Sequence, residues 1–211
     1  MTFEPLTPER RRQQTREYLL QAAARVFAER GFHGASLDEV AAAAGFTKGA
    51  VYSNFKNKED LFLALLEANQ QREMDALYAT LNASDVLPEA RLPDFVNLIR
   101  EEIRDLGANW DILNQEFALY AMRNPGAREK LAEFESATIE KVAELMGAER
   151  TRRGSEPLEH PDHVARIIVA LFRGIGIMRA LDADVVDESF LETTMSFLAQ
   201  GLLSVPAQSP T

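Results

Sequence analysis

One stretch, SLDEVAAAAGFTKGAVYSNF at residues 36–55, constrains the fold of this chain more than any other. Its first half has apolar residues at helical spacing, namely Leu37, Val40, Ala41 and Ala44, which predicts a short helix with one apolar face. Ser36 and Glu39 have the spacing of a capping box at the start of that helix, and Gly45 is placed to end it.

A second short helix follows directly. Thr47 is positioned to cap it, because a threonine hydroxyl can accept from a backbone N–H of the first turn. The alanines of the first helix are small enough for the two helices to approach closely. The stretch therefore predicts a helix-turn-helix motif.

The second helix indicates what this motif is for. If Ala50, Val51 and Phe55 face the interior, the groups left outside are Thr47, Lys48, Gly49, Tyr52 and Ser53. They offer hydroxyls, an ammonium, a phenol and bare backbone, which suit phosphate contact and close approach to a DNA groove, and none is a carboxylate. The alternative, which this short pattern leaves open, is the solvent-facing side of an ordinary helix.

The run from Thr15 to Leu61 resembles the N-terminal domain of the TetR family of transcriptional regulators. The matching pieces are TREYLLQAAARVFAERGF and SLDEVAAAAGFTKGAVYSNFKNKEDLF. The resemblance implies an all-α protein with a three-helix, helix-turn-helix DNA-binding domain at residues 1–57. A larger helical domain for ligand binding and dimerisation would occupy residues 58–211.

The resemblance also implies roles for individual residues. Lys48 and Tyr52 would bind phosphate, and Gly49 and Ala50 would come near base edges. The full set of implied DNA-binding residues is Ser36, Thr47, Lys48, Gly49, Ala50, Tyr52, Ser53 and Lys58. Within it, Ser36 and Thr47 are hydroxyl donors and Lys58 is a phosphate contact, whereas Ser53 departs from the histidine found in many relatives.

The charge of the chain is divided unevenly between these two regions. The net charge is −10, but residues 1–60 carry nine of the 23 basic and eight of the 33 acidic residues, leaving fourteen and twenty-five for the rest. The acidity belongs to the C-terminal region, so a positive patch in the N-terminal region remains compatible with DNA. The absence of cysteine and of a ~20-residue apolar run predicts a cytoplasmic protein without a membrane segment.

Helical spacing continues along the rest of the chain. The segment up to about Arg12 is expected to be loose, the alternative being an early helical turn capped by Thr7, Pro8 and Glu9. A helix is then expected from Thr15 to Gly31, and a fourth from an Asn57 cap to about Leu81. Further helices are predicted at residues 92–106, 110–123, 125–147 and 164–181, with a last one around residues 190–202. No part of the chain has a strand pattern.

The last two helices are apolar on more than one side. We expect them to form a four-helix homodimer interface with a second copy, the alternative being a large monomeric core. Two recognition helices about 34 Å apart would then meet successive major grooves of a palindromic operator.

A small-molecule pocket is predicted inside the C-terminal domain, lined by Trp110, Phe117, Tyr120, Phe172 and Arg173. For the aromatic residues, plain core packing is an equal alternative. The Arg173 guanidinium, set in the apolar run ALFRGIGIM, would pair either with an internal carboxylate such as Glu116 or with an anionic ligand.

The sequence predicts no enzyme, cofactor, catalytic residue or metal site. Its best rival constellation is His160 and His163 with their acidic neighbours, where Pro161 and an exposed loop argue against a pre-shaped metal site. The predicted function is a repressor released from its operator by a small molecule. The alternative is a helical protein–protein adaptor that has lost DNA binding.

Overall fold

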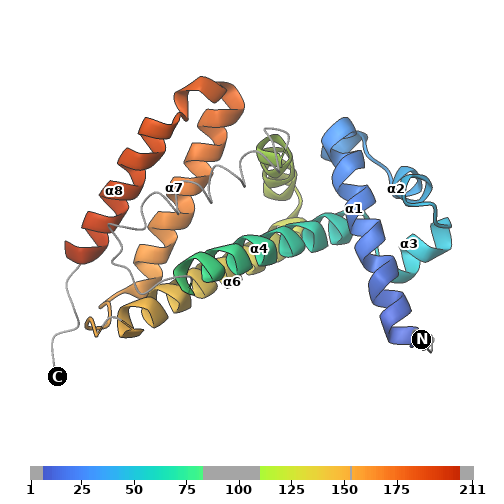
Figure 1. The fold of residues 1–211 in the computed structure, drawn as a ribbon. Coiled ribbons are helices and arrows are strands. Elements are labelled where there is room, and N and C mark those ends of the chain that lie inside the picture. The colour runs from blue at the N-terminus through green and yellow to red at the C-terminus, as the bar shows by residue number, and fades with distance from the viewer. Residues whose placement is uncertain (1–6, 83–109, 153, 205–211) are drawn as a thin grey trace. The chain divides into compact units, whose positions relative to one another are not determined.

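The computed structural model describes residues 7–82, 110–152 and 154–204, and their regular structure is helical, without a strand (Figure 1). The helices are α1 (Pro8–Gly34), α2 (Leu37–Ala44), α3 (Lys48–Asn54), α4 (Lys58–Asn82), a helix at residues 110–123, α6 (Pro125–Arg152), α7 (Pro161–Leu181), the short 3-10 helix η2 (Ala183–Val185) and α8 (Glu188–Ser204). The predicted all-α class is thus confirmed. Within these ranges no helix is both long and apolar enough to cross a membrane.

The chain divides into two compact units. The first comprises Met1–Asn69 and Leu113–Leu131, and the second comprises Gln70–Ile112 and Ala132–Thr211. The sequence-based boundary after residue 57 stays a prediction. The predicted helix at residues 92–106 lies outside the described residues.

In the first unit, α2 and α3 pack beside α1 (Figure 1). The predicted apolar face of α1 is buried, at Leu19, Ala22, Ala23, Val26 and Phe27. Helices α2 and α3 contact α1, and Val40 and Ala41 of α2 and Val51 of α3 are buried as well. Burying the larger of these side chains, such as Leu, Val and Phe, stabilises the unit by roughly 1.5–3 kcal/mol each, so the three helices hold one another in place.

The expectation of a loose segment reaching Arg12 was wrong for residues 8–12, which are helical, and the alternative of an early turn capped at Thr7 is what forms. Residues 1–6 lie outside the described residues. Helix α1 begins at Pro8, where the Thr7 hydroxyl accepts a hydrogen bond of 3.3 Å from the Arg10 N–H. Proline at the first helical position loses no hydrogen bond and presets the helical φ. A cap and a proline therefore start the helix before its apolar face begins.

The other end of α1 is fixed by a glycine and a distant carboxylate. Gly31 has φ 70° and ψ 170°, and a Cβ there would lie 2.8 Å from Glu116 Oε2. The same oxygen accepts a 2.6 Å hydrogen bond from the Phe32 N–H. Only glycine combines this φ with so close an approach, which explains why the regular helix breaks at Gly31 as predicted.

In the second unit, a buried ion pair joins Asp111 to Arg179 of α7, with side chains only 13% and 12% exposed. Gly176 makes room for it, since a Cβ there would lie 2.7 Å from Asp111 Oδ1. Burial raises the pKa of Asp111, although the hydrogen bond and charge of Arg179 act against that rise.

Candidate nucleic-acid interface

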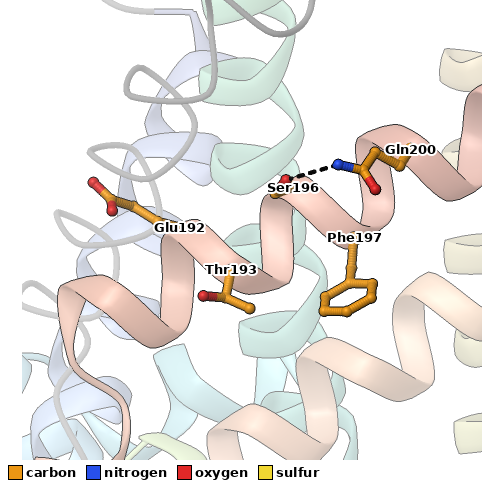
Figure 2. Close-up of a pocket in the computed structure, with 5 residues that line it drawn as sticks. All are labelled: Glu192, Thr193, Ser196, Phe197 and Gln200. Atoms are coloured by element: carbon orange, nitrogen blue, oxygen red, sulfur yellow. Dashed lines mark hydrogen bonds between the residues drawn. The ribbon is translucent and has the colours of Figure 1, made fainter.

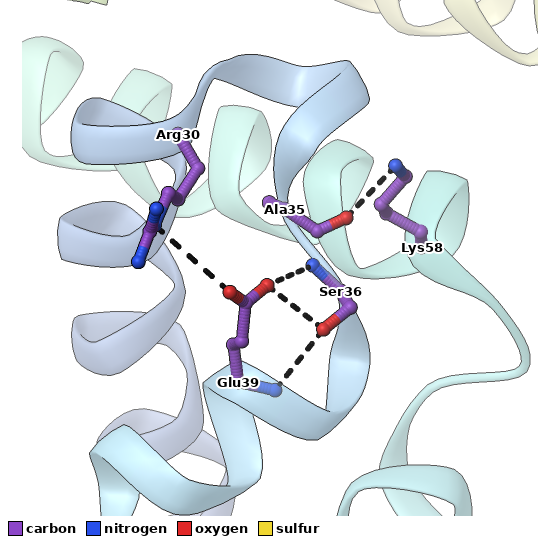
Figure 3. A network of polar contacts seen from close by, with 5 residues as sticks. All are labelled: Arg30, Ala35, Ser36, Glu39 and Lys58. Atoms are coloured by element: carbon purple, nitrogen blue, oxygen red, sulfur yellow. Dashed lines mark hydrogen bonds and ion pairs between the residues drawn. The ribbon is translucent and has the colours of Figure 1, made fainter.

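The entrance to α2 carries the predicted capping box (Figure 3). The Ser36 hydroxyl accepts from the Glu39 N–H at 3.2 Å, and Glu39 Oε2 accepts from the Ser36 N–H at 3.0 Å. Arg30 of α1 lies 3.9 Å from the other oxygen of Glu39. The box therefore fixes both the start of α2 and its position against α1.

The turn between the helices is equally defined. Gly45 takes the left-handed conformation with φ 71° and ψ 24°, and its N–H bonds back to α2. The Phe46 N–H donates to Ala41 O at 2.9 Å. Thr47 then caps α3 by accepting from the Ala50 N–H at 3.2 Å. The predicted helix-turn-helix is confirmed with these boundaries.

Helix α3 exposes the side chains that the sequence placed outside. Thr47, Lys48, Gly49, Tyr52 and Ser53 are exposed, Ala50 is half-buried, and Val51 and Phe55 are buried. Tyr52 keeps 57% of its surface exposed although its ring is large and apolar. Since α3 contains no carboxylate, this face can approach a polyanion without charge repulsion from its own helix.

The three predicted hydroxyl groups differ in what they have left to donate. Ser36 Oγ donates to Glu39 Oε2 at 2.8 Å, and Ser53 Oγ donates to Ala50 O at 2.9 Å. Thr47 Oγ1 is an acceptor in its cap bond, so its own proton is not used by that bond. A phosphate oxygen needs a donor, which makes Thr47 the best placed of the three.

Lys48 is held by a neighbour that the sequence did not single out. Its ammonium donates to Asp38 Oδ2, from the first turn of α2, while the two side chains remain 67% and 49% exposed. The hydrogen bond to Asp38, followed by its charge, raises the pKa of Lys48. Lys48 is thus fully charged at neutral pH.

Lys58 serves the fold in this structure. Its ammonium donates to Ala35 O at 2.9 Å (Figure 3). It also donates to His33 O at 3.1 Å and lies 4.9 Å from the centre of the Phe32 ring. Desolvation by burial lowers the pKa of Lys58 despite the opposing charge of Glu39. With two of three N–H groups used, one remains for any phosphate.

Two arginines of α1 hold the far end of α3. Arg12 donates to Ser53 O and Arg16 donates to Asn54 O, each at 3.4 Å. The Arg16 guanidinium also lies 4.5 Å from the centre of the Phe55 ring. Cations at a helix C-terminus are favourable. These two arginines were not predicted from the sequence as partners of α3, although their spacing of four places them on one face of a helix.

The predicted pocket residues are divided between the two units. Phe117 and Tyr120 belong to an aromatic cluster of the first unit, where the Phe117 ring centre lies 4.5 Å from that of Phe62 and 5.0 Å from that of Phe32. Trp110, Phe172 and Arg173 belong to the second unit. A pocket shared by all five stays a prediction.

The carboxylate partner of Arg173 is Glu135 of α6. Glu116, the partner suggested by the sequence, accepts from the Phe32 N–H instead. The Arg173 side chain is still 49% exposed. An exposed arginine with one carboxylate partner keeps several N–H donors for a ligand.

Other candidate sites are less complete. The His160 and His163 ring centres lie 4.9 Å apart, but among the described residues no group of three or more histidine, aspartate or glutamate side chains could hold a metal. A surface hollow on α8 is lined by Glu192, Thr193, Ser196, Phe197 and Gln200 (Figure 2). Residues from a single helix cannot enclose a small molecule, so this hollow is open.

Comparison with known proteins decides the family. Residues 19–65 match the family model described as bacterial regulatory proteins, tetR family. The chain is 33% identical over 147 residues to the uncharacterized HTH-type transcriptional regulator YdgC of Bacillus subtilis, covering 63% of this chain and 75% of YdgC. The chain belongs to the TetR family of transcriptional regulators.

Other known proteins match over different lengths. The HTH-type transcriptional regulator AcrR of Shigella flexneri is 36% identical over 99 residues, 44% of this chain and 46% of AcrR, so the chain spans less than half of that relative. The solved structure of the fatty acid degradation regulator FadR from Bacillus halodurans has a TM-score of 0.66 at 23% identity, covering 95% of this chain and 97% of FadR. That likeness shows a shared fold.

Proposed function

We propose that this TetR-family protein is a ligand-responsive repressor that binds a palindromic operator as a homodimer and is released by a small molecule. The observation that carries the proposal is the exposed, carboxylate-free face of α3, fixed by caps at both flanking turns. A dimer occupying a promoter blocks transcription without any further contact, so repression needs only this surface and a second copy.

On this proposal Lys48, Tyr52 and Thr47 bind phosphates and hold α3 in register with the major groove. Gly49 and Ala50 then lie close to base edges, where a bare backbone and a methyl group fit. Ser36 and Ser53 are weaker members of the set, since their hydroxyl protons are already donated within the protein. Lys58 adds one donor from the start of α4.

The dimer is proposed to form through α7 and α8. Both helices expose large apolar side chains, namely Ile167, Ile177, Met178 and Leu181 of α7 and Phe197 of α8. Leu181 and Phe197 are 84% and 72% exposed, and a self-complementary contact would remove them from water. Residues 1–57 would then act as the DNA-binding part and residues 58–211 as the ligand-binding and dimerisation part.

The effector is proposed to contact Trp110, Phe172 and Arg173 in the second unit, whereas Phe117 and Tyr120 have the core-packing role in the aromatic cluster. Ligand binding would act on the DNA-binding part, residues 1–57, through α4. A coupling free energy of about 1–3 kcal/mol changes operator affinity about 5–150-fold. Replacing Arg173 with methionine should weaken the response to the effector and leave operator affinity unchanged. An unchanged response would remove Arg173 from the ligand site.

Selection of random DNA duplexes on the purified protein tests the proposal at two salt concentrations. The expected result is enrichment of one palindrome, bound much more weakly at the higher salt. The Lys48→Met variant, which keeps the cap of α3, should enrich the same palindrome less. No enrichment at either salt would favour the adaptor alternative.

A further inference from the structure

We infer that Asp38 occupies, in the DNA-free protein, the place that a DNA phosphate takes on Lys48, and that it thereby limits the affinity of the protein for its operator. The inference rests on the proposed function, because it needs α3 to face DNA. It assigns a regulating role to a residue of α2 that is not itself a DNA contact.

The geometry is consistent with competition between the Asp38 carboxylate and a DNA phosphate for the Lys48 ammonium. Lys48 is the first residue of α3 and donates to Asp38 Oδ2, while the two side chains are 67% and 49% exposed. A positive charge in the first turn of a helix is disfavoured by the helix dipole. Asp38 offsets that cost, and so would a phosphate oxygen approaching the same exposed ammonium.

Asp38 also differs from the other acidic residue in this turn. Glu39 is engaged in the capping box and with Arg30, so its carboxylate is needed for α2 itself. For Asp38 the structure gives Lys48 as the hydrogen-bonding partner. On this inference a DNA phosphate replaces Asp38 on the Lys48 ammonium, although the ammonium has further N–H donors, and the Asp38 carboxylate is left beside the polyanion.

Loss of the Lys48–Asp38 ion pair and repulsion between the Asp38 carboxylate and DNA both lower the affinity for DNA. An exposed ion pair and one like-charge approach correspond to roughly a threefold change in affinity at each site, so roughly tenfold for a dimer that uses two copies. Asp38→Asn should thus bind the enriched duplex about tenfold more tightly than the wild type. The asparagine keeps the size of the side chain and its helix position.

The test measures affinity for the enriched duplex with four proteins: wild type, Asp38→Asn, Lys48→Met and the double variant. If Asp38 acts by competing for Lys48, most of the gain from Asp38→Asn disappears in the Lys48→Met background. Glu9→Gln is the matched control, since Glu9 is also exposed and also the second residue of its helix. It should change affinity much less than Asp38→Asn does.

Three results would overturn the inference. Weaker binding by Asp38→Asn would mean that Asp38 orients Lys48 toward DNA, and an equal gain in both backgrounds would mean a general charge effect. Unchanged affinity would mean that the pair does not affect binding. In each case the wild type still binds the duplex, whereas failure of the wild type to bind any duplex would overturn the proposed function as well.

Discussion

Replacing Gly49 with alanine should change stability and DNA affinity in opposite directions. A Cβ added at Gly49 would find Thr47 Oγ1 at 3.8 Å as its nearest neighbour, an ordinary van der Waals contact. Within the protein nothing therefore requires glycine here. Because glycine in a helix costs about 0.5–1 kcal/mol relative to alanine, Gly49→Ala should raise the free energy of unfolding by up to that amount, which corresponds to a rise of about 1–4 °C in Tm.

The same change should weaken operator binding. If α3 brings its backbone against base edges at Gly49, the added methyl group separates the surfaces, and we expect at least a tenfold loss, about 1.4 kcal/mol. Gly126→Ala is the matched control, since Gly126 is also the second residue of a helix and has open space around its Cβ position. Thermal unfolding and fluorescence anisotropy on the enriched duplex measure both effects. Unchanged affinity for Gly49→Ala would refute the close approach.

Three further perturbations test the structure. Lys48→Met should reduce the slope of log affinity against log salt by about 0.9 for each phosphate that the protein no longer neutralises, hence about 1.8 for a dimer, and an unchanged slope would exclude phosphate binding by Lys48. Ser36→Ala should cost about 1 kcal/mol in urea unfolding because the capping box is removed, and a neutral result would contradict that role. Arg179→Met should cost about 3 kcal/mol at pH 7, because it leaves Asp111 buried and unpaired. That cost should shrink as pH falls through the raised pKa of Asp111, where the neutral carboxyl is cheaper to bury, and a pH-independent cost would contradict this cause.

The local chemistry of the first unit could be predicted because it is encoded by neighbours in sequence. The Ser36 and Glu39 box, the Gly45 turn and the Thr47 cap each need residues only a few positions apart. The exposed face of α3 followed from the same periodicity. The early start of α1 was only the alternative prediction, because the apolar pattern begins later than the Thr7 cap and Pro8.

Contacts between residues far apart in the sequence could not be predicted from apolar periodicity. The hydrogen bond from the Phe32 N–H to Glu116 spans 84 residues, and the Asp111–Arg179 pair spans 68. Nothing in the local pattern distinguishes Glu116 as a partner of the Phe32 backbone from Glu116 as a partner of Arg173. Such choices depend on how helices pack, which the sequence alone left open.

The proposed function requires α3 to contact DNA and α8 to contact a second copy of the chain, and photocrosslinking can test both contacts. p-Benzoylphenylalanine would replace Tyr52 on α3 in one protein and Phe197 on α8 in another, since both native aromatic rings are largely exposed. With the enriched duplex present, we expect DNA adducts from position 52 and adducts to a second copy of the chain from position 197. DNA adducts from position 197, or none from position 52 on a duplex that the protein binds, would contradict this expectation.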